Sequence, residues 1–167
     1  VTEIFHALKS VLKDGGFDTT VGDEGGFAPG VAIKPAKNKF GYEIKGVMTL
    51  EKALAALKTA TEKAGYKFGS DIKIALDVAS SEFCDKNTKK GKPETYTFKK
   101  STKKTLKSAD MVKLYEKLID KYSIFSIEDG LDEADWAGWK VMTDKLGAKI
   151  NLVGDDLFVT NPTIFDE

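Results

Sequence analysis

Apolar residues along the chain recur in two alternating patterns, one of helical spacing and one of short continuous runs. In the first stretch they recur every three or four residues and stop at Gly15-Gly16, which is typical of an amphipathic helix. Thr49 is a plausible cap for a second helix because its hydroxyl can accept a backbone N–H. The helices predicted in this way run from Val1 to Leu12, from Thr49 to Gly65, from Ser108 or Asp110 to Tyr122, and from Asp132 to Gly147.

Short apolar runs that lie between these helices predict strands. They are apolar on both faces, as buried parallel strands are, and the order strand, helix, strand implies a parallel sheet with crossover connections. A complete eight-unit barrel needs about 250 residues. The fold class predicted is therefore α/β, a partial (β/α)8 TIM-type barrel with about four strands present. These strands are Asp18 to Val21, Ile72 to Leu76, Ser123 to Ile127 and Ile150 to Val153.

Two polar insertions lengthen the connections between these elements. The stretch from Gly30 to Gly46 is rich in lysine and reads as an extended loop or a small hairpin. The stretch from Lys86 to Lys107 is also rich in lysine, and the run Tyr96 to Phe98 inside it has strand-forming residues. We expect a solvated hairpin there rather than a nucleic-acid site.

Composition narrows the class of protein without giving a function. The 167 residues are 41% hydrophobic and 31% charged, which fits a globular domain. The net charge is zero, so neither nucleic acid nor an anionic membrane is favoured as a partner. No apolar run approaches the roughly 20 residues of a membrane span. Cys84 is the single cysteine, and a chain without internal disulfides is typical of a reducing, cytoplasmic compartment.

Four acidic residues stand at the ends of the predicted strands: Glu24, Asp77, Glu128 and Asp155. Active sites of parallel barrels lie at the C-terminal ends of the strands. Carboxylates gathered there repel one another unless a hard cation neutralises them, and Mg2+ prefers oxygen ligands. Any one of these acids could be a structural cap, but four at successive strand ends favour a Mg2+-dependent barrel enzyme. Among the other acids, Asp23, Asp129 and Asp156 could cap or orient a neighbour, and Asp132 and Asp135 could start a helix.

The segments that carry these acids resemble the enolases, the glycolytic phosphopyruvate hydratases. VGDEGGFAP, IALDVASSEF, SIEDGLDEADW and LVGDDLFVTNP occur in the order of that family and span nearly the whole chain. The resemblance implies that residues 1–167 are part of the C-terminal barrel domain, without the N-terminal capping domain and the last barrel units. It also implies a lyase that reversibly dehydrates 2-phospho-D-glycerate to phosphoenolpyruvate with Mg2+. Such enzymes are expected in the cytoplasm, with a second surface or secreted pool, as dimers or larger homo-oligomers.

The resemblance also assigns a role to each acid. Asp77, Glu128 and Asp155 would be the Mg2+ ligands, and Glu128 and Asp155 would also lie beside bound substrate. Glu24 would be the proton donor to the leaving hydroxyl. The family's base lysine and its substrate-binding histidine and lysine lie outside the segment, so we expect the 167-residue chain to be inactive alone.

Two positions and one segment depart from the expected pattern, and two alternatives stay open. Val78 stands where a small residue or cysteine is expected, Gly130 where many relatives have proline, and the insertion from Gly30 to Gly46 is long. One alternative is another enolase-superfamily enzyme that acts on a different acid. The other is a binding or structural protein that has lost catalysis. A lysine at a strand end beyond Glu167 would favour the enzyme.

Overall fold

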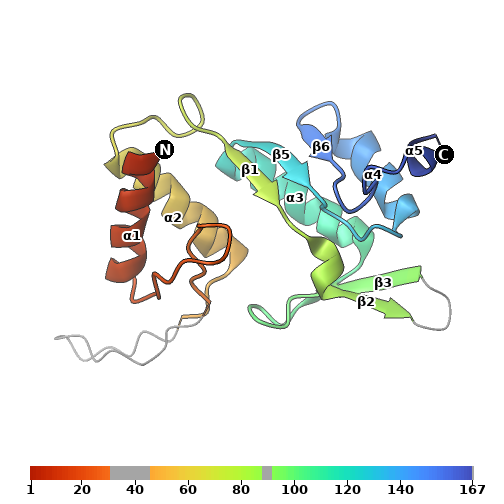
Figure 1. Ribbon diagram of the computed structural model, residues 1–167, viewed down its shortest axis with the longest axis horizontal. Helices are drawn as coiled ribbons and strands as arrows, with labels where there is room; N and C mark the ends of the chain where they lie inside the picture. Colours follow the sequence, from red (N-terminus) through yellow and green to blue (C-terminus); the bar gives the residue numbers. More distant parts are fainter. Residues whose placement is uncertain (31–45, 88–91, 167) are drawn as a thin grey trace. The chain divides into compact units, whose positions relative to one another are not determined.

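A computed structural model of the chain describes residues 1–30, 46–87 and 92–166 and divides them into two compact units (Figure 1). The first unit comprises Val1–Ile72 with Lys100–Thr102, and the second comprises Lys73–Lys99 and Lys103–Glu167. Most of the insertion predicted between Gly30 and Gly46 lies outside the described residues, as does the tip of the lysine-rich hairpin.

The first unit is a pair of packed helices, α1 (Thr2–Asp14) and α2 (Leu50–Lys63). Leu12 of α1 and Leu54 of α2 are buried. The hydroxyl oxygen of Thr49 accepts the N–H of Lys52 at 3.3 Å, which confirms the predicted cap of α2. Both helices therefore follow the apolar spacing of the sequence, although Val1 at the start of the first face is exposed.

The strand predicted from Asp18 to Val21 is wrong. Val21 forms one isolated antiparallel bridge with Phe27, and the rest of the segment has no strand pairing. The Asp18 carboxylate accepts the backbone N–H of Thr20 at 2.9 Å and its hydroxyl at 2.7 Å. Such local side-chain bonds give the backbone an alternative to a sheet ladder. The described residues accordingly contain three parallel strands instead of about four.

The second unit is built on a parallel sheet with the strand order β1-β5-β6. These strands are β1 (Ile74–Asp77), β5 (Ile124–Glu128) and β6 (Asn151–Val153). Their alternation with helices confirms the predicted parallel arrangement of a partial barrel; the sheet is not closed.

The register of this sheet places side chains in rows across the strands. Leu76, Ile127 and Leu152 form one row, and Asp77, Glu128 and Val153 form the next. Adjacent rows face opposite sides of a sheet. Ile127 is fully buried, whereas Val153 is 40% exposed. The row that contains both acids is therefore on the more open face.

Two long helices of this unit, α3 (Ser108–Tyr122) and α4 (Trp136–Leu146), pack against each other, and α3 also packs on β5. The buried side chains recur at helical spacing, with Met111, Tyr115, Leu118 and Tyr122 on α3 and Trp139, Met142 and Leu146 on α4. The start predicted for α4 at Asp132 is wrong. The Asp132 carboxylate binds the N–H of Ala134 at 2.9 Å in a preceding turn, and Asp135 caps the helix through the N–H of Gly138 at 3.0 Å.

The lysine-rich hairpin is confirmed as a small antiparallel sheet of β2 (Cys84–Asn87), β3 (Lys92–Thr97) and β4 (Thr105–Leu106). A short 3-10 helix, η1 (Ser80–Phe83), leads into it, and α5 (Pro162–Phe165) follows later in the chain. Tyr96 is fully buried and its hydroxyl donates to the Asp135 carboxylate at 2.8 Å, which ties the hairpin to the start of α4. In the described part of the chain, every helix is too short or too polar to cross a bilayer.

Candidate metal centre

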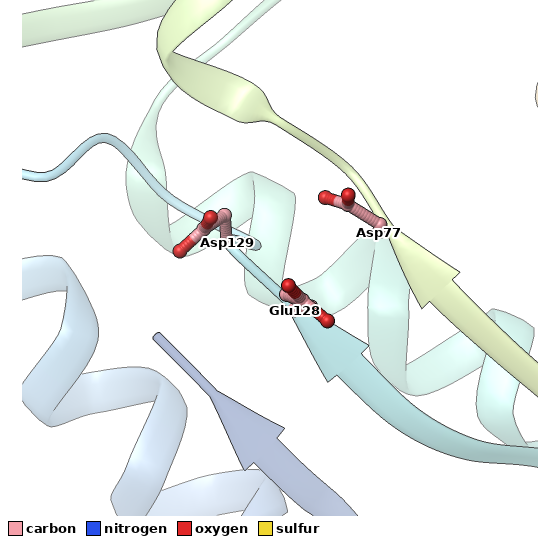
Figure 2. A group of neighbouring side chains, drawn as sticks. All are labelled: Asp77, Glu128 and Asp129. Carbon is pink, nitrogen blue, oxygen red and sulfur yellow. The ribbon is translucent and has the colours of Figure 1, made fainter. Parts of the chain in front are cut away.

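Asp77 and Glu128 are the last residues of two adjacent parallel strands, β1 and β5, and they are paired in the sheet register. Figure 2 shows the two carboxylates side by side at these strand ends, with Asp129 on the coil that leaves β5. Oxygen atoms of Asp77, Glu128 and Asp129 all lie within 4.8 Å of one another. The sheet register therefore creates a compact group of acidic oxygens, as the sequence predicted for the first two.

The backbone around Asp77 keeps its carboxylate at the strand end. Oδ1 of Asp77 accepts the N–H of Ala79 at 3.2 Å, and Ala79 has a left-handed φ of 43°. The N–H of Val78 donates to the carbonyl of Glu128 at 3.0 Å, so β1 and β5 stay joined up to the two acids. The Asp77 side chain is exposed and is open to a ligand.

Asp155, the third predicted ligand, lies two residues beyond β6 and falls in a second acidic group. That group contains Asp129, Asp155 and Asp156, with oxygen atoms within 4.8 Å of one another. Asp129 belongs to both groups and connects them. The structure thus brings Asp77 and Glu128 directly together and joins Asp155 to them through Asp129.

Asp129 has more contacts in the structure than its place in the sequence suggests. It is 5% exposed, and its two carboxylate oxygens accept the N–H groups of Asp155 and Asp156, each at 3.0 Å. The prediction that Asp129 could orient a neighbour is thereby confirmed. The sequence contains one acidic pair in SIED and another in GDD, but the hydrogen bond between them joins residues that are 26 positions apart.

The electrostatics of the group show an excess of negative charge. Partial burial raises the pKa of Glu128, and the neighbouring acids Asp77, Asp129, Asp155 and Asp156 raise it further. The pKa of Asp156 is also raised, chiefly by the charge of Asp129 and then by partial burial and Asp155. A bound cation would relieve this repulsion. Because every donor is a carboxylate oxygen, the site fits a hard divalent cation such as Mg2+.

Glu24, the predicted proton donor, lies in the first unit, in a loop closed by its own backbone. The N–H of Gly22 donates to the carbonyl of Gly26 at 2.8 Å, and that of Gly25 to the carbonyl of Gly22 at 2.9 Å. Gly25 has a φ of 83°, which glycine adopts without strain. The rings of Phe5 and Phe27 stack with their centroids 4.4 Å apart, and this contact joins the end of the loop to α1. Glu24 itself is exposed, and its role stays a prediction because the acidic groups belong to the other unit.

Comparison with known protein families gives a match over the whole chain. The family described as "Enolase, C-terminal TIM barrel domain" matches residues 1–167. The match includes both the strand ends that carry the acidic groups and the glycine loop that carries Glu24.

Proposed function

Because this chain belongs to the enolase C-terminal TIM barrel domain family, we propose that it serves in the reversible, Mg2+-dependent dehydration of 2-phospho-D-glycerate to phosphoenolpyruvate. One observation carries the proposal: Asp77 and Glu128 end adjacent parallel strands in register, beside an Asp155 loop tied down by Asp129. The location agrees with the rule that catalytic groups of such barrels lie at the carboxyl ends of the strands.

Asp77, Glu128 and Asp155 would hold the metal ion through their carboxylates. Mg2+, when bound, supplies Lewis-acid stabilisation of the negative charge that builds up on the substrate, which is the established pattern of the enolase superfamily itself rather than a deduction from this chain. Glu128 and Asp155 would also lie beside the substrate and orient it. Their surplus negative charge explains why an anionic substrate would bind only to the metal-loaded site.

The dehydration removes one proton from C2 of the substrate and adds another to the departing hydroxyl group, and Glu24 would supply this second proton. Hydroxide is a poor leaving group, so its departure requires a proton donor positioned next to it. We propose that the Glu24 carboxyl group gives its proton to the departing hydroxyl oxygen. Its exposed position on a glycine-rich loop supports this role, since the side chain is accessible to a ligand.

The proposal is tested with the full-length protein that carries this chain. Phosphoenolpyruvate formation from 2-phosphoglycerate is followed by ultraviolet absorbance with Mg2+, after chelation, and after Mg2+ is restored. Turnover that disappears on chelation and returns with Mg2+ is expected. Absence of phosphoenolpyruvate with Mg2+ present would contradict the proposal, and turnover of a different 2-hydroxy acid alone would assign another superfamily reaction.

Cellular context follows from the same proposal. A reaction of central carbohydrate metabolism belongs in the cytoplasm, where the single cysteine, Cys84, would stay reduced. We also propose that the full-length protein is a homo-oligomer. Sedimentation of the purified protein tests this second point separately.

A further inference from the structure

We propose that Asp129 is a positioning residue that fixes the geometry of the metal centre without being a metal ligand itself. The inference rests on the proposed Mg2+ site, although it does not depend on which substrate the site binds. It concerns the one acid that is common to both acidic groups.

The Asp129 side chain is committed to the loop that carries Asp155. One carboxylate oxygen accepts the N–H of Asp155 and the other accepts the N–H of Asp156, both at 3.0 Å. Hydrogen bonds from N–H groups to a carboxylate are stronger than those between neutral groups. Two of them from successive residues fix both the position and the direction of the loop beyond β6.

The Asp129 backbone is bound to the end of β6 and to the start of η1, the short helix that follows β1. Its N–H donates to the carbonyl of Val153 at the end of β6, at 3.0 Å. Its carbonyl accepts from both the N–H and the hydroxyl of Ser80, at 3.1 and 2.8 Å. Ser80 is fully buried and lies three residues after Asp77. One residue therefore joins the start of η1 after β1, the end of β5 and the loop after β6.

This arrangement needs a backbone conformation that is uncommon for aspartate. Asp129 has a φ of 43°, in the left-handed region that residues other than glycine enter at a cost. Glu128 is the last residue of β5, and this conformation turns the backbone out of the strand at Asp129. The Asp129 carboxylate therefore reaches the N–H groups of Asp155 and Asp156. The local strain is offset by the hydrogen bonds of both its backbone and its side chain.

A positioning role and a ligand role predict different ion selectivity. Mg2+ requires near-octahedral geometry at short oxygen distances, whereas Ca2+ accepts longer distances and flexible geometry. Loosening the Asp155 loop should therefore weaken Mg2+ binding more than Ca2+ binding. Losing a ligand oxygen should weaken both ions together.

The test is calorimetric titration of the full-length protein with Mg2+ alone and with Ca2+ alone. In Asp129→Asn, the amide oxygen can accept one of the two N–H groups, but the amide nitrogen then faces the other donor. We expect Mg2+ affinity to fall by roughly 10–100-fold, the range typical for residues that orient metal ligands. We expect Ca2+ affinity to fall by a smaller factor, so that the ratio of the two affinities shifts toward Ca2+.

Asp156→Asn is the matched control. It removes one charge from the same group but keeps both hydrogen bonds to Asp129, because those use backbone N–H groups. Both ions should weaken by a similar factor in this variant, with the affinity ratio unchanged. If Asp129→Asn also leaves the ratio unchanged, or weakens both ions as much as Asp155→Asn does, the positioning role is overturned.

Ser80→Ala is a second variant that tests the same positioning role. If Asp129→Asn does not fold, Ser80→Ala replaces it, because it removes the hydroxyl bond to the Asp129 carbonyl and leaves the N–H bond. A smaller shift toward Ca2+ supports the role, and an unchanged ratio overturns it.

If the unmodified protein binds neither ion, the proposed metal centre itself fails. That result is distinct from a protein that binds Mg2+ with an affinity that does not change in Asp129→Asn.

Discussion

The carboxylates of Asp77 and Glu128 lie side by side because their strands, β1 and β5, pair in parallel and end at the same level. Two acids so close raise the free energy of the protein unless something neutralises them, and burial with the neighbouring charges raises the pKa of Glu128 accordingly. This relationship is more readily explained by a ligand than by packing. The acids lie on the open face of the sheet, where they add little to the core.

Glu24→Gln in the full-length protein should separate the two halves of the proposed reaction. Glutamine keeps the size of the side chain but has no acidic proton, so loss of hydroxide should slow by roughly 10²–10⁴-fold. Exchange of the C2 hydrogen of 2-phosphoglycerate with solvent should survive. Deuterium incorporation measured by NMR, beside a turnover assay, reads both steps.

Two results would contradict this role of Glu24. If exchange and dehydration fall together, Glu24 positions the substrate or the metal site. If neither step changes, the glycine loop takes no part in the chemistry. Asp23→Asn, the same charge change at the neighbouring loop position, controls for loss of loop charge.

Asp135→Ala should destabilise the protein by about 2–4 kcal/mol. The variant removes the cap of α4, worth about 0.5–2 kcal/mol, and leaves the buried Tyr96 hydroxyl without this acceptor, at about 1–3 kcal/mol. The Ser108 hydroxyl, which also donates to Asp135, loses the same acceptor. Denaturant unfolding followed by circular dichroism measures the change.

Asp144→Ala is the control for that measurement. Asp144 forms an exposed ion pair with Lys140 on the same helix at 2.9 Å, and such pairs contribute about 0–1 kcal/mol. If the two variants lose equal stability, the buried network around Asp135 does not have the importance assigned to it.

Tyr115 should make stability depend on pH in the alkaline range. Burial raises the pKa of Tyr115 above its ordinary value of about 10, and its hydroxyl donates to the Gly130 carbonyl at 2.7 Å. Because the folded pKa is higher than the unfolded one, this contribution is fully present below about pH 10 and is lost as the pH rises further.

Tyr115→Phe isolates this contribution. At neutral pH the variant should be less stable by about 1 kcal/mol, the net value of one hydrogen bond. The difference from the unmodified protein should shrink as the pH rises above about 10, as measured by denaturant unfolding at several pH values. A difference that stays constant with pH would show that Tyr115 ionises equally in both states.

The sequence predicted those features that depend on local spacing. Residues such as Met111 and Tyr115 recur at helical intervals and pack as expected, and Thr49 caps α2 through a bond within one turn. The predicted strand at Asp18 failed for the same local reason, since the Asp18 carboxylate binds the backbone at Thr20. Here a short-range hydrogen bond outweighed a weak strand pattern.

Long-range contacts explain what the sequence did not predict. The bonds from Asp155 and Asp156 to Asp129 exist only after β6 has paired with β5, so no local pattern reveals them. The sequence predicted that α4 starts at Asp132, but the helix is capped by Asp135 instead. Asp135 also accepts a hydrogen bond from Tyr96, which is distant in sequence. The strand-end location of Asp77 and Glu128 was predictable, whereas the hydrogen bonds from Asp155 and Asp156 to Asp129 were not.

The central claim, that the acids at these strand ends hold Mg2+, is tested most directly by calorimetric Mg2+ binding to Asp77→Asn in the full-length protein. The amide can still accept the N–H of Ala79 and should leave the unfolding temperature nearly unchanged, but it lacks the charge that a hard cation requires. Asp71→Asn is the control, an exposed aspartate whose carboxylate likewise accepts a backbone N–H, from Lys67. We predict that Asp77→Asn lowers Mg2+ affinity by roughly 10–100-fold or more. Asp71→Asn should leave the Mg2+ affinity unchanged. Equal Mg2+ affinity in Asp77→Asn and the unmodified protein would contradict the claim.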